Sequence, residues 1–431
     1  MALKIVRVYP KNRVLAWIED RLPAMSFLSA HTVTYYAPKN FNIWYYFGVL
    51  ASVVLVNQLV TGIFLAMHFK PSAAEAFSSV EYIMRDVEWG WLIRYMHSTG
   101  ASLFFVVIYL HMFRALLYGS FKRPRELVWV LGMLIYLTLM AEAFMGYVLP
   151  WGQMSFWGAK VIISLFGAIP VIGNGLTEWI MGDYLPGDAT LNRFFALHVI
   201  ALPLVLLLLV TTHILALHEV GSNNPDGVEI SEHPDGDGRP IDGIPFHPYY
   251  TVEDTLSTVA FLLVAAFLVF FTPTVGGLFL EHDNFVEADP LVTPEHIRPA
   301  WYFTPFYAML RVIPDKLSGV IVMFAAIGAL FLLPWLDRGK VRSVRYRGLG
   351  YRVAIFAFAT AFVGLGFVGM GTTASLVEGI VGPGGNVNEI DNWIGRAMVA
   401  VYFGFFAFLW IYTYFGLERT RPVPDRLTPD N

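Results

Sequence analysis

Long apolar runs separated by short polar connections dominate the chain. A transmembrane helix needs about 20 mostly apolar residues. Eight runs qualify, at residues 43–67, 92–117, 128–149, 195–217, 257–276, 317–336, 353–372 and 393–415. The pattern therefore predicts an all-α membrane protein with eight transmembrane helices.

The segments outside the spans differ in character. Residues 1–23 alternate apolar positions with Lys and Arg and lack the compact apolar core of a signal peptide, which favours a helix lying on the membrane surface. The connections at 150–193 and 272–316 are long, apolar and rich in aromatic residues. Long loops of this kind usually form functional surface structure.

The basic residues predict the orientation of the spans. If both termini lie inside, the inner segments hold 20 of the 29 Lys and Arg residues, and both aromatic loops lie outside. Cytoplasmic loops carry an excess of Lys and Arg, so this orientation is favoured over its opposite.

The amino-acid composition rules out several classes of protein. Charged residues make up 14% of the chain and hydrophobic residues 56%, with a mean hydropathy of +0.56. This composition excludes a soluble enzyme. A net charge of −4 also argues against a nucleic-acid-binding protein, which would carry an excess of basic residues. Because Cys is absent, the chain can hold neither a Cys-ligated iron–sulfur cluster nor a haem attached through a Cys-x-x-Cys-His motif.

Two pairs of histidines lie inside spans. His97 and His111 are 14 residues apart in the second span, and His198 and His213 are 15 apart in the fourth. Either interval keeps both rings roughly on one helix face, about 21–22 Å apart along the axis. Since both spans run from outside to inside, His97 is level with His198 and His111 with His213.

Two histidines facing each other across a bundle can ligate one haem iron from both sides, and two such layers would hold two haems. Ligation by two His leaves no open coordination site and suits electron transfer. Glycines in the first and third spans repeat the 14-residue interval and would give a porphyrin room; they are Gly48, Gly62, Gly132 and Gly146. Arg94, Arg114 and Arg193 are placed to pair with haem propionates. The prediction is a haem-binding four-helix bundle formed by the first four spans, followed by four further spans.

Simpler interpretations exist for each feature taken alone. An intramembrane His can be a packing residue or a proton relay, and paired Gly can merely permit close helix packing. A transporter or channel also has many spans. Few carboxylates lie within the spans, however, and no matched broken helices occur in two halves. The combination of His, Gly and Arg favours haem.

The sequence resembles cytochrome b, the membrane subunit of the cytochrome bc complex (quinol–cytochrome c oxidoreductase), over nearly its full length. The matching motifs are GWLIRYMHSTGASLFFVVIYLHMFRALLYGS, GYVLPWGQMSFWGA, RFFALH, HEVGSNNP, HPYY and PAWYFTPFYAMLR. The length and extended ends are typical of bacterial members. The resemblance implies a surface segment at 1–40, a haem bundle at 41–220 with outer loop helices at 150–193, an inner loop at 221–256, a C-terminal domain at 257–416 and a tail at 417–431.

The resemblance implies two non-covalent b-type haems, a low-potential outer one on His97 and His198 and a high-potential inner one on His111 and His213. It implies quinol oxidation outside and quinone reduction inside, with a proton gradient as the result. The implied outer site comprises Tyr147, Gly158, Ile162, Trp301, Tyr302 and Tyr307. The implied inner site uses His218 and Asp254 as proton donors, since quinone reduction needs groups that titrate near neutral pH or are reachable from water.

One departure from the family pattern concerns proton transfer. The usual Pro-Glu-Trp-Tyr reads Pro299-Ala300-Trp301-Tyr302 here, and alanine cannot accept a quinol proton. We expect Glu281, near the end of the fifth span, to serve instead. The competing carboxylates in the same loop are Asp283, Glu287 and Glu295.

The absence of cysteine bears on partners. The family passes electrons to a Rieske iron–sulfur protein and a c-type cytochrome, so other subunits must supply both cofactors. The resemblance further implies ubiquinone as substrate, a homodimer of complexes, contact with membrane lipids and a place in the bacterial inner membrane. A simpler dihaem membrane reductase is the nearer alternative, and the outer-loop motifs argue against it.

Overall fold

The computed structural model describes residues 7–382 and 385–428. Within these residues, eight helical segments are long and apolar enough to cross a membrane, which confirms the predicted fold. Their bounds are Ile43–Ala66, Gly90–Tyr118, Glu126–Val148, Asp188–Val220, Phe246–Phe271, Lys316–Leu336, Leu349–Met370 and Val387–Tyr414.

The principal helices of the spans are α3 (Phe47–Ala66), α5 (Gly90–Tyr118), α6 (Glu126–Val148), α10 (Leu202–Val220), α11 (Thr251–Phe271), α13 (Lys316–Leu336), α14 (Leu349–Met370) and α16 (Val387–Tyr414). Shorter helices connect or flank them: α1 (Arg13–Arg21), α2 (Ala24–Thr32), α4 (Ala76–Arg85), α7 (Gln153–Ser164), α8 (Gly173–Met181), α9 (Asp188–Ala196), α12 (Thr304–Arg311) and α15 (Thr372–Val381). Strands β1 (Tyr36–Pro38) and β2 (Gly243–Pro245) form a small antiparallel ribbon, with Ala37 opposite Ile244.

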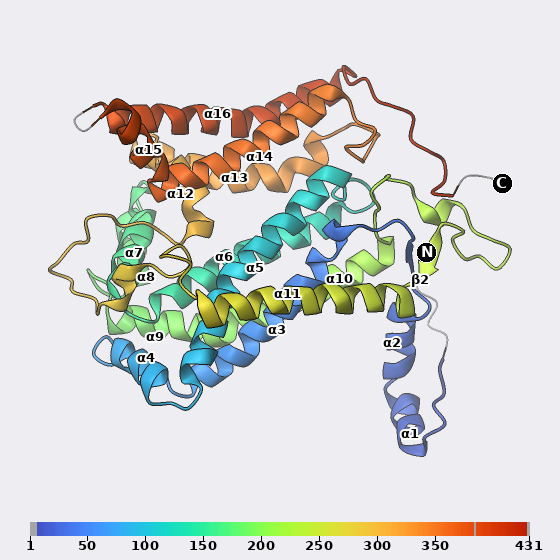
Figure 1. The fold of residues 1–431 in the computed structure, drawn as a ribbon, viewed down its shortest axis with the longest axis horizontal. Coiled ribbons are helices and arrows are strands. Elements are labelled where there is room, and N and C mark those ends of the chain that lie inside the picture. The colour runs from blue at the N-terminus through green and yellow to red at the C-terminus, as the bar shows by residue number, and fades with distance from the viewer. Residues whose placement is uncertain (1–6, 383–384, 429–431) are drawn as a thin grey trace.

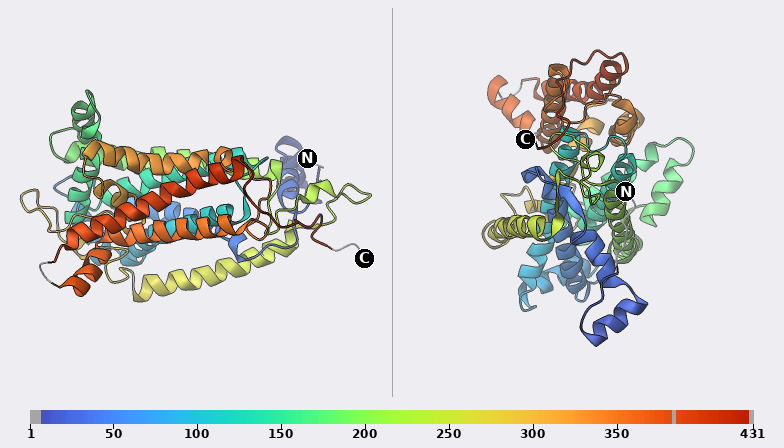
Figure 2. Two further views of the ribbon diagram at one scale, coloured as in Figure 1. Left: turned by 90° about the horizontal axis from the view of Figure 1, so that it is seen from above. Right: turned by 90° about the vertical axis from the view of Figure 1, so that its right-hand side faces the viewer.

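The long helices run side by side along the length of the molecule (Figure 2). Helices α3 and α5 pack together, as do α6 and α10, while α12, α13, α14 and α16 form a second group. Helices α1 and α2 and residues 415–428 lie at one end, and α4, α7, α8 and α9 lie at the other (Figure 1). We call these the inner and outer ends.

The fifth span differs from its prediction in bounds and packing. Helix α11 begins at Thr251, within the predicted inner loop 221–256, and ends at Phe271. Acidic Glu253 and Asp254 occupy its first turn, where the helix dipole favours negative charge. Helix α11 packs against α3 and α5, so by contact it lies with the first four spans rather than with the domain predicted at 257–416.

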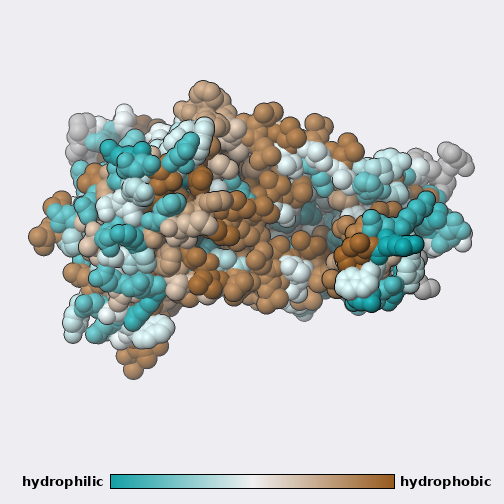
Figure 3. Space-filling view, turned by 90° about the horizontal axis from the view of Figure 1, so that it is seen from below, coloured by the Kyte–Doolittle hydropathy of each residue, from teal (hydrophilic) through white to brown (hydrophobic). Residues whose placement is uncertain are grey.

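On the face shown in Figure 3, apolar side chains cover most of the middle of the molecule, and polar residues gather toward both ends. On α11, Leu263, Phe267 and Phe271 are all more than half exposed. In water such a surface would be unstable, whereas lipid tails are as apolar as the side chains themselves. The apolar belt is what a multi-pass membrane protein requires.

The predicted surface helix at 1–23 falls partly on residues 1–6, which lie outside the described residues. Within the described part, α1 extends away from the helix bundle at the inner end (Figure 1). Trp17 and Leu22 are 57% and 64% exposed. The exposed apolar residues fit contact with a membrane surface, where such side chains enter the boundary between headgroups and acyl chains.

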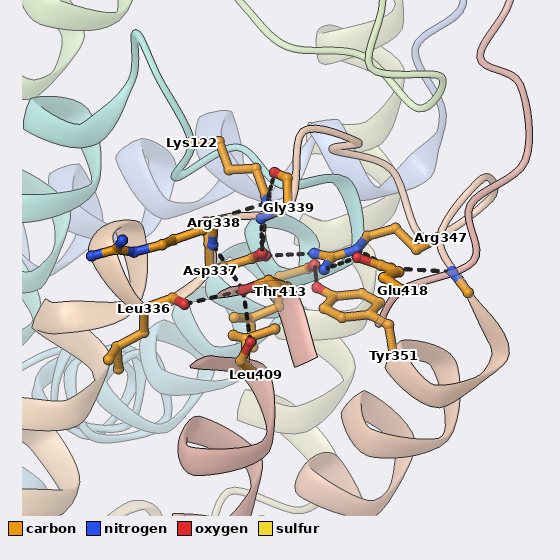
Figure 4. Close-up of polar contacts among 12 residues, drawn as sticks. Lys122, Leu336, Asp337, Arg338, Gly339, Arg347, Tyr351, Leu409, Thr413 and Glu418 are labelled. Carbon is orange, nitrogen blue, oxygen red and sulfur yellow. Dashed lines mark hydrogen bonds and ion pairs between the residues drawn. The ribbon is translucent and has the colours of Figure 1, made fainter. Parts of the chain in front are cut away.

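A buried ion network joins the two helix groups at the inner end. Asp337, just after α13, lies 2.7 Å from Lys122 and 2.5 Å from Arg347. Arg347 also pairs with Glu418 at 2.8 Å. Figure 4 shows Asp337 between the two cations, with Arg347 lying over the ring of Tyr351. Because Lys122 precedes α6 and Glu418 follows α16, the network ties together segments far apart in sequence.

Candidate functional site

The four intramembrane histidines meet in two pairs, as their spacing predicts. The ring centres of His97 and His198 are 6.2 Å apart, and those of His111 and His213 are 6.5 Å apart. Helix α5 carries the first partner of each pair. The planes of the rings cross at 86° in the outer pair and 62° in the inner pair.

These separations fit a metal held between the two rings of each pair. An iron–imidazole bond of about 2 Å on each side, plus about 1 Å from each bonded nitrogen to its ring centre, requires centres roughly 6 Å apart. Both measured distances match this requirement. The residues present therefore fit the b-type haem binding of the family they resemble.

The outer pair is oriented by neighbouring polar groups. His97 Nδ1 lies 2.9 Å from the Thr61 hydroxyl. His198 Nδ1 lies 2.9 Å from the backbone carbonyl of Glu142 and 3.1 Å from its carboxylate. Metal-binding histidines commonly engage a carbonyl or carboxylate through the second ring nitrogen, which fixes the tautomer and leaves the other nitrogen for the metal.

The four predicted glycines all lie against histidine rings. A Cβ atom added at Gly62 would stand 3.2 Å from His97 Cε1, and one added at Gly146 would stand 2.4 Å from His198 Cε1. At the inner pair, Gly48 and Gly132 would each bring a Cβ atom to 3.3 Å from the nearest ring carbon, those of His111 and His213 respectively. Glycine at these positions gives room to the ligand imidazoles, with Gly146 the tightest.

His198 lies in a locally widened stretch of helix. Residues Leu197–Ala201 adopt the π-helical pattern between α9 and α10. Pro203, two residues beyond this stretch, has no backbone N–H to donate, so the regular hydrogen-bond ladder is interrupted here. Single π-turns of this kind occur frequently at functional sites.

The three predicted arginines have different surroundings. Arg94 lines the cavity beside the outer pair. Arg114 donates to Ser120 at 3.2 Å and lies over the ring of Tyr45, while its buried Nε has no partner among the described residues. Arg193 is exposed and donates to the carbonyl of Trp179. The structure does not bring Arg193 into the cavity lining, because this backbone contact holds its side chain elsewhere.

A cavity opens beside the outer histidine pair. Its empty volume, which includes open solvent at the mouth, is about 1520 Å³. His97, His198, Gly62 and Gly146 line one part of it; Tyr147, Phe279 and Tyr302 line another. The predicted outer haem position and the predicted quinol position thus share one continuous space.

Glu281 is buried at the edge of this region. Its side chain is 5% exposed, and its carboxylate accepts a hydrogen bond of 2.7 Å from the Tyr147 hydroxyl. Burial raises the pKa of Glu281 above the ordinary carboxyl value, although the bond from Tyr147 opposes the rise. The competing acids Asp283, Glu287 and Glu295 are exposed.

The other predicted outer-site residues do not line this cavity, although two of them lie against residues that do. Gly158 adjoins Tyr147, with an added Cβ atom 4.0 Å from the ring. Trp301 is stacked with Phe279, a cavity residue, at 6.3 Å. Tyr307 donates to the carbonyl of Ile297 at 3.4 Å. Gly158, Ile162, Trp301 and Tyr307 are outside the lining of the cavity.

The predicted inner-site residues lie at the inner end on different helices. His218, near the end of α10, has its ring stacked on Tyr35 at 4.4 Å and on His31 at 5.0 Å. Asp254 lies in the first turn of α11. The described residues show no direct contact between His218 and Asp254, and the structure adds His31 and Tyr35 to this region.

Sequence reasoning missed several residues of the site. Glu142 could have been identified from the sequence, because a carboxylate inside a transmembrane span is energetically costly and is usually functional. Thr61 and Phe279 gave no signal, since a threonine in a helix and a phenylalanine in a loop are common. Only their contacts with His97 and Trp301 reveal them.

Comparisons with known proteins agree with this geometry. Family models described as Cytochrome b/b6/petB and Cytochrome b(C-terminal)/b6/petD match residues 32–221 and 287–381. Cytochrome b of Allochromatium vinosum is 54% identical, covering 97% of this chain and 99% of the relative. Cytochrome b of Rickettsia bellii is 46% identical over 96% of this chain and 97% of the relative.

A solved structure titled "Hyperthermophilic respiratory Complex III" superposes with a TM-score of 0.82 at 35% identity, covering 93% of this chain and 99% of that one. The long family motifs, the paired histidines and the eight spans agree with these matches. The chain therefore belongs to the cytochrome b family, in the form found in bacterial bc complexes.

Proposed function

We propose that this chain is the dihaem, quinol-oxidising subunit of a respiratory or photosynthetic quinol–cytochrome c oxidoreductase. The observation that carries the proposal is the pair of facing histidine couples, with ring centres 6.2 and 6.5 Å apart. His97 and His198 would hold a low-potential outer haem, and His111 and His213 a high-potential inner haem. The haems, when bound, supply one-electron transfer across the membrane.

The outer cavity provides for quinol binding and proton removal. Tyr147 and Tyr302 line it, and Trp301 and Tyr307 flank it. Glu281 takes the place of the family's missing glutamate: its carboxylate accepts the quinol proton through the Tyr147 hydroxyl, to which it is hydrogen-bonded. A base near the operating pH is the most effective proton acceptor, and burial moves Glu281 in that direction.

The inner site reduces quinone. His218 and Asp254 deliver protons taken from the inner side, while electrons arrive from the outer site. Quinol oxidation outside releases protons there, so the two half-reactions together build a proton gradient (a Q cycle). His218 lies in a cluster of aromatic rings that can receive the flat quinone head.

Other subunits complete the reaction. The chain has no cysteine, so a Rieske iron–sulfur protein and a membrane-anchored c-type cytochrome accept the electrons that leave the outer site. We infer ubiquinone as the substrate, lipid contacts along the apolar belt, a homodimer of complexes, and a place in the bacterial inner membrane. The similarity to a respiratory complex III supports this assembly.

Haem content tests the proposal. The purified complex should contain two b-type haems per chain. Gly146→Ala should remove the outer haem and leave the inner one, because its Cβ atom would stand 2.4 Å from His198. Gly404→Ala is the matched control, since an added Cβ meets nothing within 4 Å.

The readout is the reduced-minus-oxidised absorbance spectrum, normalised to the amount of chain. A colourless wild-type chain would refute the proposal, and so would a Gly146→Ala variant that retains both haems.

A further inference from the structure

One face of α5 links the haem-ligand helix to the outer quinol site. Ser102, Phe105 and Tyr109 lie three and four residues apart, so they share a helix face. All three contact Trp301 or Tyr302, which precede α12. We call these three residues the α5 stripe. It lies between His97 and His111, the two histidines that α5 contributes.

Each residue of the α5 stripe makes a different kind of contact. The Trp301 ring nitrogen donates to the Ser102 hydroxyl at 3.2 Å. The Phe105 ring is stacked on the Tyr302 ring, with centres 4.0 Å apart and planes within 3°. The Tyr109 hydroxyl donates to the Tyr302 backbone carbonyl at 2.5 Å. Together they fix the backbone and the ring of Tyr302.

The residues that make these contacts are buried, except Tyr109 and Trp301, which are half-buried. Ser102 is 1% exposed, Phe105 0% and Tyr302 4%. A buried carbonyl left without its donor costs the full desolvation penalty of that group. The Tyr109 hydroxyl is therefore a strong restraint on the position of Tyr302.

A second tyrosine orients the first. Tyr136, on α6, is 1% exposed, and its hydroxyl lies 3.2 Å from that of Tyr109. A tyrosine hydroxyl has one hydrogen to donate, and that of Tyr109 goes to the Tyr302 carbonyl. Tyr136 must then donate to Tyr109. The chain of bonds runs from Tyr136 through Tyr109 to Tyr302, and each bond polarises the next.

We propose that Tyr109 is a positioning residue for quinol oxidation: through the α5 stripe it holds the Tyr302 ring at a fixed place in the cavity shared with His97. This inference rests on the proposed function. Helix α5 carries both the stripe and His97, so the helix sets the separation between the quinol site and the outer haem ligand. A misplacement of about 1 Å can slow a well-aligned reaction roughly 100-fold.

Removal of the one hydroxyl tests the proposal in the intact complex. Tyr109→Phe keeps the ring and deletes the bond to Tyr302. We expect kcat/KM for quinol oxidation to fall roughly tenfold, the factor that corresponds to one lost buried hydrogen bond. Haem content and the absorbance spectrum should stay unchanged, because no haem ligand is touched.

Matched variants separate positioning from general stability. Tyr402→Phe deletes another fully buried hydroxyl, which donates to the Ala326 carbonyl at 3.0 Å and not to the site. It should leave kcat/KM unchanged. Tyr136→Phe removes only the orienting bond and should give a smaller loss than Tyr109→Phe. Ser102→Ala frees Trp301 and should also lower kcat/KM, which keeps the proposal testable if Tyr109→Phe does not assemble.

Binding gives a readout independent of turnover. The Kd of a redox-inert quinol analogue, measured by equilibrium dialysis on the complex, should rise in Tyr109→Phe and not in Tyr402→Phe. Wild-type binding and kcat/KM in Tyr109→Phe would overturn the positioning role, as would equal losses in both variants. A wild-type complex that contains two haems but oxidises no quinol would instead refute the proposed function.

Discussion

Glu281 and Tyr147 are 134 residues apart in sequence, yet the carboxylate of one accepts a hydrogen bond from the other. The sequence suggested Glu281 because Ala300 replaces the glutamate of the family motif. Four loop acids were candidates, and only Glu281 is buried beside a residue of the cavity. Burial depends on the path of the loop over the bundle, which no local pattern encodes.

Glu281→Gln should slow quinol oxidation and change its pH dependence. A proton acceptor works when deprotonated, so wild-type turnover should fall as pH drops through the pKa of Glu281. Because burial raises that pKa, the fall should occur above the value of about 4.3 of an exposed glutamate. In the variant, the rate of quinol oxidation should no longer show this fall at low pH. The measurement is the rate of quinol oxidation as a function of pH.

Two further variants make the Glu281 experiment decisive. Glu295→Gln alters an exposed acid of the same loop and should keep the wild-type profile. Adding Ala300→Glu to Glu281→Gln should restore part of the rate by returning a carboxylate to the motif. An unchanged profile in Glu281→Gln would rule out the assignment.

At the scale of elements, the spans and the two levels at which their histidines meet were predictable, whereas the packing of α11 was not. Spacing within one helix follows from 3.6 residues per turn, so the shared face of His97 and His111 could be worked out in advance. The contacts of α11 with α3 and α5, and the ion network around Asp337, depend on how separate helices approach one another. The number of residues that separate two helices in the sequence does not show how closely they pack.

Asp337→Asn tests how strongly the network holds the elements together. The change leaves Lys122 and Arg347 buried with one anion fewer, and breaking a buried ion pair costs about 3–5 kcal/mol. We expect a clearly lowered Tm for the detergent-solubilised complex. The control is Glu75→Gln, which breaks an exposed pair with Lys70 and should cost at most about 1 kcal/mol. Similar Tm values for the two variants would contradict this role.

At the scale of the whole molecule, an even number of spans returns the chain to the end where it started. Helices α1 and α2 and residues 415–428 accordingly lie at the same end (Figure 1). The distribution of Lys and Arg assigns that end to the inside. The fold and the charge asymmetry are independent observations, and together they define a testable topology.

Single cysteines can report this topology because the chain has none of its own. Leu291 is 93% exposed in the outer loop, and Gly236 has open space around it in the inner loop. A membrane-impermeant maleimide applied to spheroplasts should label Leu291→Cys at once, and Gly236→Cys only after the membrane is opened. The reverse pattern would show that the orientation is wrong.

The sequence by itself determined the eight spans, the levels of the four histidines and the glycines that accompany them. These depend on local composition and helical periodicity, which are properties of a continuous segment. The tertiary structure alone decided which glycine lies against which histidine ring. It also decided that Glu142 and Thr61 contact the outer histidine pair and that the α5 stripe contacts Tyr302. Those facts arise from side chains of different helices meeting in space, where packing and not periodicity sets the distance.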